Sequence, residues 1–170
     1  MKGYKFFWAG PLSQWHRSDF ELEDQLFVTA EQAMMYFKAT LFRDEKIAKR
    51  ILGTTDPGKQ KSLGRKVKGF DEKIWRKKRE DIVYRVNTAK FDQNSGLRRT
   101  LFQTAGLQLV EASPVDTIWG IGLSAAQAQK QSPETWPGQN LLGQILTGVR
   151  EELIQKYPDQ AANVLKEKAE

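Results

Sequence analysis

The stretch from Ser113 to Gly122 places an acid, an indole and two glycines within a few residues of one another. Asp116 can carry a charge, and Trp119 offers a flat apolar face with one N–H donor. Gly120 and Gly122 allow a ligand or another backbone segment to approach closely. These residue types suit a catalytic loop. Spacing alone favours a structural interpretation, in which a buried Trp lies beside a turn formed by the Asp side chain.

A second acid lies at the start of a predicted helix. Thr29 is a helix-capping residue type, and Gln32 follows it three positions later, which is the pattern of a capping box. The helix is expected to run from Ala30 to about Phe42. Glu31 then falls in the first turn, where the helix dipole stabilises a carboxylate. Because a first-turn Glu is commonly only a helix stabiliser, the position alone assigns no catalytic role.

Cations gather ahead of the longest predicted helix, which is expected from Asp71 to about Ala89. Arg65, Lys66 and Lys68 could together meet a phosphate, although such a run is more often a solvated loop. Trp75, inside the long helix, is expected to belong to the core.

The composition excludes several kinds of chemistry. The 170 residues include no cysteine and a single histidine, so disulfides, thiolate catalysis and a His-rich metal site are excluded. The absence of cysteine fits a reducing compartment, and we expect a cytoplasmic protein. We find no long apolar run that could span a membrane. Phosphate-binding loop, dinucleotide-binding and metalloprotease motifs are also absent. No metal or organic cofactor is therefore expected.

Carboxylates, tryptophans and cations remain as the chemical inventory, and the net charge of +6 favours an anionic partner. That partner is either nucleic acid or a phosphorylated small molecule. Cleavage of a glycosidic bond would use all three residue types. A carboxylate stabilises the oxocarbenium-like transition state, an aromatic face stacks on the departing heterocycle, and cations hold a phosphate.

The hydrophobic patterning predicts an α+β fold that is mostly helical, with several helices around a few short strands. We assign residues 1–157 to one domain and residues 158–170 to a charged C-terminal tail. Strands are predicted at 5–7, 20–23, 26–28 and 107–111, and further helices at 44–52, 57–64, 95–106 and 140–153. Asn140 is expected to cap the helix that follows it.

Several short motifs together cover most of the chain, from about Phe6 to Leu153. They are Gly10–Ser13, Thr29–Ala33, Leu63–Lys68, Ala89–Phe91, Leu97–Arg98, Ser113–Gly122 and Gly138–Gly143. In their order and spacing the sequence resembles the NADAR family, the group related to the YbiA-like N-glycosidases. Two positions differ from the family pattern. This chain has Gln14-Trp15 where Asn-Phe is common, and Gln32 where His often follows the Glu.

The resemblance implies hydrolysis of an N-glycosidic bond between a base-like heterocycle and a phosphorylated ribose. Family members act on early riboflavin-pathway intermediates or remove ADP-ribose from guanine in nucleic acid. The catalytic positions carried over are Glu31 and Asp116. The substrate-binding candidates are Trp75, Trp119, Arg65, Lys66, Lys68 and Lys90. Two roles remain open for Asp116: direct action as an acid or base, or structural bracing of its loop.

Two rival functions stay open at this point. One is a non-catalytic module that binds ADP-ribose or a related nucleotide. The other is a nucleic-acid-binding protein that uses the cations between Lys59 and Arg79. The partner is therefore a phosphorylated ribosyl compound or an ADP-ribosylated nucleic acid, with no membrane involved, and the sequence does not predict an oligomeric state.

Overall fold

The computed structural model describes residues 3–169. Residues 1–2 and 170, which the predicted domain and tail include, lie outside the described residues. The internal contacts group the chain into two compact units. Gln14–Asn94 form what we call the central unit. The residues up to Ser13 and those from Ser95 onward form what we call the terminal unit. Each unit is described by itself below.

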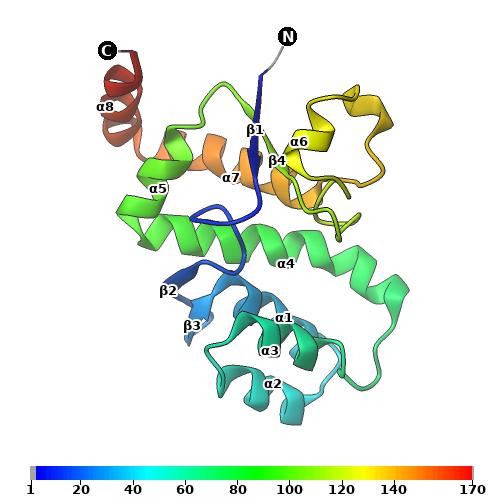
Figure 1. The fold of residues 1–170 in the computed structure, drawn as a ribbon. Helices are drawn as coiled ribbons and strands as arrows, with labels where there is room; N and C mark the ends of the chain where they lie inside the picture. The colour runs from blue at the N-terminus through cyan, green and yellow to red at the C-terminus, as the bar shows by residue number, and fades with distance from the viewer. Residues whose placement is uncertain (1–2, 170) are drawn as a thin grey trace. The chain divides into compact units, whose positions relative to one another are not determined.

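The central unit consists of one β-hairpin and four helices (Figure 1). Strands β2 and β3 pair antiparallel, with Phe20 opposite Phe27. Glu23 and Asp24 connect them with φ angles of 54° and 60°, the backbone that a tight hairpin turn requires. The two strands predicted at 20–23 and 26–28 thus form a hairpin. The elements are β2 (Arg17–Leu22), β3 (Gln25–Thr29), α1 (Ala30–Leu41), α2 (Glu45–Leu52), α3 (Pro57–Gly64) and α4 (Glu72–Gln93).

Aspartate caps begin three of these helices, at or next to the starts of the predicted helices. Asp44 accepts a hydrogen bond from the Ile47 amide at 3.1 Å, and Asp56 accepts one from the Lys59 amide at 3.1 Å. Asp71 accepts from the first turn of α4 in the same way. Each side chain satisfies backbone donors that a helix leaves unpaired at its N-terminus.

A buried polar network ties the start of α1 to the segment between α2 and α3. The Thr29 hydroxyl donates to the Gln60 side chain at 2.7 Å. The Gln32 and Gln60 amides both donate to the Thr54 carbonyl, at 3.0 and 2.8 Å. Gln32 also donates to the Ile51 carbonyl. The Gln at position 32 is therefore used to hold neighbouring backbone, which explains a polar side chain in this buried place.

Helix α4 differs from its prediction in two respects. It runs through Gln93 rather than ending at Ala89, so Lys90 and Phe91 are helical and buried. Ile74, which the pattern assigns to the core, is 46% exposed. The helix lengthens because Lys90 and Phe91 lie on its buried side, and burial of apolar surface stabilises the extra turn.

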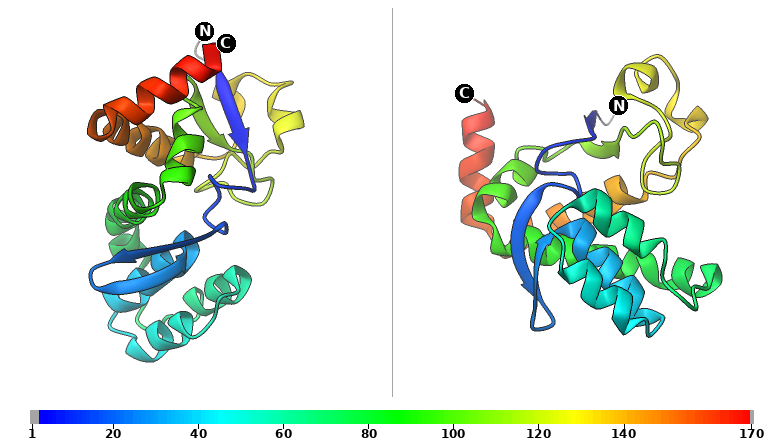
Figure 2. Two further views of the ribbon diagram at one scale, coloured as in Figure 1. Left: turned by 90° about the vertical axis from the view of Figure 1, so that its left-hand side faces the viewer. Right: turned by 60° about the horizontal axis from the view of Figure 1, so that its bottom comes forward.

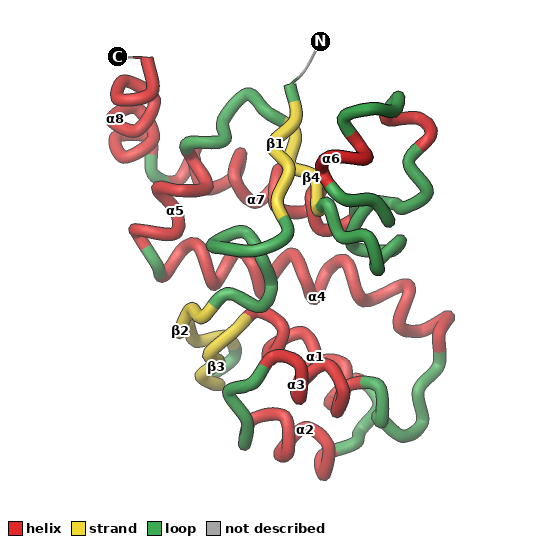
Figure 3. Tube along the Cα trace, viewed as in Figure 1, coloured by secondary structure: helices red, strands yellow, loops and turns green. Residues whose placement is uncertain are grey.

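The terminal unit is built around two short parallel strands, drawn in yellow in Figure 3. Strand β1 pairs with β4 in a register that sets Tyr4 opposite Gln108. Helix α5 ends at Phe102 rather than near Gly106, because a turn of residues 103–106 leads into β4. The elements are β1 (Tyr4–Phe7), α5 (Ser95–Phe102), β4 (Gln108–Glu111), α6 (Ala125–Ala128), a short 3₁₀ turn at Pro133–Thr135, α7 (Leu141–Lys156) and α8 (Pro158–Ala169).

The last helix, α8, packs against α5 and α7 (Figure 2). Its residues Ala161 and Val164 are buried. The Arg98 guanidinium of α5 lies 3.7 Å from the centre of the Tyr157 ring and donates to the Gln160 side chain at 2.7 Å. The charged C-terminal segment is thus an amphipathic helix with one apolar side on the unit's core.

Asn140 stands at the start of α7, as predicted, but its side chain does not cap that helix. It instead completes β4: its oxygen accepts from the Glu111 amide at 2.9 Å, and its nitrogen donates to the Leu109 carbonyl at 3.0 Å. Its left-handed backbone, with φ of 54°, turns the amide toward the strand. Asn140 therefore fixes α7 to the short sheet.

The predicted fold class is confirmed as α+β and mostly helical. Throughout residues 3–169, every helix falls short of the length and apolar character that crossing a membrane demands.

Candidate active site

Glu31 lies in the first turn of α1, a helix of the central unit. Thr29 caps this helix by accepting a hydrogen bond from the Gln32 amide at 3.0 Å, so the predicted helix start is confirmed. The Glu31 amide donates to the Gln14 carbonyl at 3.0 Å. The side chain of Glu31 is 5% exposed. A carboxylate buried at a helix N-terminus is stabilised in its charged form by the helix dipole.

Lys38, two turns after Glu31 on the same helix, was not singled out from the sequence. Its ammonium group lies 4.3 Å from the centre of the Phe70 ring and 5.5 Å from that of Trp75. Burial is the main cause that lowers the pKa of Lys38. The charges of Glu72 and Glu31 raise that pKa, and the charge of Arg65 lowers it.

The structure thus brings three predicted residues, Glu31, Arg65 and Trp75, into the surroundings of one lysine. The spacing of seven residues between Glu31 and Lys38 puts both on one side of a helix, and this was the signal available in the sequence.

Lys90 is an unusual titratable group of the central unit. Its side chain is fully buried in α4, and burial lowers the pKa of Lys90 to about 7. Burial and then the positive charge of Lys90 lower the pKa of His16. The Gln14 carbonyl accepts the hydrogen bond from the Glu31 amide, and His16, two residues later, is affected by the charge of Lys90. The short segment 14–16 therefore interacts with Glu31 at one end and with Lys90 at the other. Helices α1 and α4, which carry the two residues, pack against each other.

Two buried amide side chains accompany these charged groups. Neither polar atom of the Gln14 amide has a hydrogen-bond partner among residues 3–169. Asn87, one turn before Lys90, donates to the Val83 carbonyl at 2.8 Å, but its oxygen likewise has no partner in the described part of the chain. Buried polar groups are nearly always hydrogen-bonded, so unpaired ones call for an explanation. Neither residue was predicted as a site residue.

The three predicted phosphate-binding cations do not act as one cluster. Arg65 influences Lys38, as described above. Lys66 instead lines a hollow between α2 and α3. The backbone amide of Lys68 donates to the Asp44 carboxylate at 2.9 Å, and its side chain is exposed. The α3–α4 loop therefore presents its charges in different surroundings.

Asp116 and Trp119 belong to the terminal unit. One carboxylate oxygen of Asp116 accepts hydrogen bonds from the amides of Ile118 and Trp119, at 2.9 and 2.8 Å. The Asp116 carbonyl accepts from the Gly122 amide at 3.0 Å. Asp116 thereby holds the loop in a fixed turn, and Trp119 is half-buried within it.

This loop is interlocked with the start of α7. The five consecutive amides of residues 138–142 donate to the five carbonyls of residues 117–121, at distances from 2.9 to 3.2 Å. The bonds of the Leu141 and Leu142 amides satisfy two of the donors that α7 leaves unpaired at its N-terminus. Gly138 is required there, because a Cβ atom would lie 2.3 Å from the Gly120 carbonyl oxygen. This close approach explains why both segments contain a glycine at the point of contact, Gly120 in one and Gly138 in the other.

Replacement of Asp116 separates bracing from acid–base catalysis. Asp116→Asn keeps an oxygen that accepts both amide hydrogen bonds, so we expect activity within about tenfold of the wild type and unchanged stability. Asp116→Ala removes the acceptor and is expected to lower the free energy of unfolding by about 1–3 kcal/mol. Product assays and denaturant unfolding measure the two effects. A stable Asp116→Asn protein without activity would instead assign the carboxylate to the chemistry.

No group of three or more His, Cys, Asp or Glu side chains within residues 3–169 is placed to hold a metal ion.

Residues 6–154 match the model of the NADAR domain. The chain belongs to the NADAR family. Among its relatives, Protein irg-1 of Caenorhabditis elegans is 44% identical over 158 residues, which are 89% of this chain and 74% of the relative. N-glycosidase R617 of Acanthamoeba polyphaga mimivirus is 48% identical over 126 residues, 74% of each protein.

N-glycosidase YbiA of Escherichia coli is 32% identical over 118 residues, 69% of this chain and 67% of the relative. The solved structure of the E. coli protein YbiA superposes with a TM-score of 0.74 and 25% identity, over 93% of this chain and 89% of that chain. Family and relatives assign this NADAR protein to the N-glycosyl hydrolases, which confirms the predicted reaction class.

Proposed function

We propose that this protein hydrolyses the N-glycosidic bond that joins a base-like heterocycle to a phosphorylated ribose. The substrate is either an early riboflavin-pathway intermediate or ADP-ribose attached to guanine in nucleic acid. The observation that carries the proposal is that two helices that pack together, α1 and α4, hold a buried carboxylate, Glu31, and a buried lysine of near-neutral pKa, Lys90.

Glu31 acts at the sugar. As the bond between the anomeric carbon and the base nitrogen breaks, positive charge develops on the ribose ring, and a carboxylate stabilises it electrostatically. The same carboxylate then accepts a proton from the water that attacks the anomeric carbon. Burial strengthens both effects, because the surrounding dielectric is low.

Lys90 acts at the leaving base. In its ammonium form it donates a proton to the base nitrogen as that nitrogen takes the electron pair of the broken bond. A general acid works best when its pKa lies near the working pH, and burial lowers the pKa of Lys90 to about 7. The proton that water gives to Glu31 balances the one that Lys90 loses, so a single water is consumed for each bond cleaved.

Both polar atoms of the Gln14 amide and the oxygen of the Asn87 amide have no partner within residues 3–169, and they support recognition of a heterocycle. Gln14 offers a donor and an acceptor next to Glu31, and Asn87 offers an acceptor one turn from Lys90. A guanine or a pyrimidinone carries complementary donors and acceptors on its edge, and binding it would satisfy atoms that are otherwise unpaired.

The family resemblance adds roles for the other predicted residues. Trp75 and Trp119 are walls for the base or the ribose. Arg65, whose charge acts on Lys38, is the phosphate contact that the structure supports best among the three loop cations. For Asp116 the contacts support bracing of the Trp119 loop.

A product assay by mass spectrometry tests this function. The protein is incubated separately with the ribosylaminopyrimidine phosphate, with DNA carrying ADP-ribosylated guanine, and with NAD. We expect one of the first two to release its sugar, as ribose 5-phosphate or ADP-ribose, with NAD intact. Absence of a released sugar from both would contradict the proposal, and tight binding of ADP-ribose without turnover would assign a binding module.

A further inference from the structure

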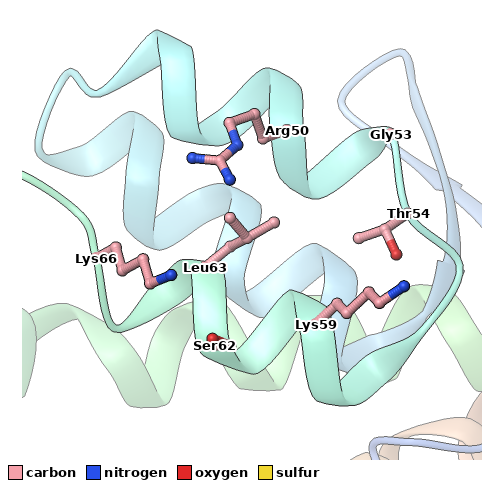
Figure 4. A pocket seen from close by; sticks show the side chains of 7 residues that line it. All are labelled: Arg50, Gly53, Thr54, Lys59, Ser62, Leu63 and Lys66. Atoms are coloured by element: carbon pink, nitrogen blue, oxygen red, sulfur yellow. The ribbon is translucent and has the colours of Figure 1, made fainter.

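A basic hollow of about 480 Å³ lies on the central unit between α2 and α3 (Figure 4). Its lining includes the three cations Arg50, Lys59 and Lys66, and among the described residues that line it there is no carboxylate. Arg50 and Lys66 extend toward one end, Lys59 toward Thr54 at the other, and Leu63 lies between them (Figure 4). Two groups of positive charge are thus separated by an apolar surface.

The wall of this hollow is held in place from inside the unit. Gln32 and Gln60 both donate to the Thr54 carbonyl, at 3.0 and 2.8 Å. The same Gln32 amide bonds the Ile51 carbonyl at the end of α2. These bonds occupy carbonyl oxygens that would otherwise repel an anion at a helix C-terminus. The cations are therefore presented on a fixed support.

An exposed tryptophan continues the hollow along α3. The Trp15 indole lies over Gly58, where a Cβ atom would meet its ring at 3.9 Å, and Gly58 directly precedes Lys59. Trp15 is 48% exposed. The carbonyl of the preceding residue, Gln14, accepts a hydrogen bond from the amide of Glu31. Trp15 is therefore one residue away from a direct contact with the residue that carries the candidate catalytic carboxylate.

We propose that Trp15 and the hollow formed by Arg50, Lys59 and Lys66 bind a single strand of nucleic acid next to the catalytic site. Cations that track phosphates, combined with an aromatic ring on which a base stacks, are the usual means of binding single strands. The apolar surface at Leu63 accommodates the sugar between two phosphates. This track deepens the proposed function, on which it rests for the reaction at Glu31, and selects a polynucleotide substrate over a free intermediate.

Binding of an unmodified single-stranded oligonucleotide tests the track without requiring turnover. Fluorescence anisotropy is recorded over a series of salt concentrations for the wild type and for the Arg50→Gln/Lys59→Gln variant. Loss of two phosphate contacts should weaken binding about tenfold near 0.1 M salt and reduce the slope of log K against log salt by about 1.4. The matched control is Lys130→Gln/Lys166→Gln, which removes two exposed lysines of the terminal unit.

The stacking platform is tested by Trp15→Ala, with Trp8→Ala as control because Trp8 is also exposed, at 58%, but belongs to the terminal unit. We expect only Trp15→Ala to weaken binding, by roughly fivefold or more, with an unchanged salt slope. Circular dichroism verifies that each variant is folded.

Equal effects of the test and control pairs would overturn the proposal, as would tighter binding of duplex than of single strand. Displacement of the oligonucleotide by equimolar inorganic phosphate would overturn it in favour of a small-phosphate site. Because the oligonucleotide carries no ADP-ribose, its binding reports on the track even if every glycosidase assay fails.

Discussion

Glu31→Gln is expected to reduce kcat for base release by about a hundredfold to ten-thousandfold, the range for loss of a positioned acid–base group. The amide keeps the size of the carboxylate, but it cannot accept a proton from water and does not neutralise the developing charge on the ribose. The variant should stay folded, because the amide fills the same space as the carboxylate, and the lost helix-dipole interaction in the first turn of α1 is worth about 0.3–1 kcal/mol. Product release measured by mass spectrometry gives the rate, and thermal unfolding gives the stability.

Glu45→Gln is the matched control for this change. Glu45 is also a first-turn glutamate, in α2, but its side chain is exposed. We expect the control to retain the wild-type rate. A Glu31→Gln enzyme that turns over at nearly the wild-type rate would remove Glu31 from the chemistry and leave it as a helix stabiliser.

Lys90→Met is expected to abolish most activity and to increase stability at neutral pH. Methionine fills a similar volume without a charge, so the cost of burying an ammonium group disappears. Because the pKa of Lys90 is about 7 in the folded protein, against about 10.4 for an unperturbed lysine, the full cost reaches up to about 5 kcal/mol. Loss of the proton donor should lower the rate at least a hundredfold.

The stability difference between Lys90→Met and the wild type should depend on pH, because the pKa of Lys90 is lower in the folded than in the unfolded protein. A lowered lysine pKa means that, between about pH 7 and 10, the unfolded chain holds a proton that the folded chain has lost. Wild-type stability therefore rises with pH in that window relative to Lys90→Met, by about 1.4 kcal/mol per pH unit. Denaturant unfolding at pH 7 and pH 9 measures it. Lys78→Met, an exposed position of α4, serves as control and should show no such change.

The pH dependence of the activity is a second test of the role of Lys90. As a general acid it must hold its proton, so kcat/KM should fall as the pH rises above about 7. A rate that rises over the same range would contradict the proton-donor role. Covalent trapping of the sugar on Lys90 by borohydride would replace that role with nucleophilic attack by the amine.

Much of the local structure could be predicted because its causes are local. The aspartate caps at Asp44, Asp56 and Asp71 and the Thr29 cap are decided by residues within one turn, and each lies where the sequence indicates. The hairpin of β2 and β3 likewise follows from alternating apolar residues around a turn. Asn140 shows where local reasoning ends, since its amide completes β4, about thirty positions earlier, rather than its own helix.

The family, the reaction class and the residue types available for it could be predicted from the sequence, because they depend on motifs whose order and spacing are read directly along the chain. The surroundings of those residues depend on how distant segments pack. Burial of Lys90 and the contacts of Lys38 with two aromatic rings arise from helix packing. Lys66 faces a hollow lined from two helices, away from its sequence neighbour Arg65. The sequence gives the type of each side chain, whereas the burial and the nearby charges that shift its pKa come from segments distant in the chain.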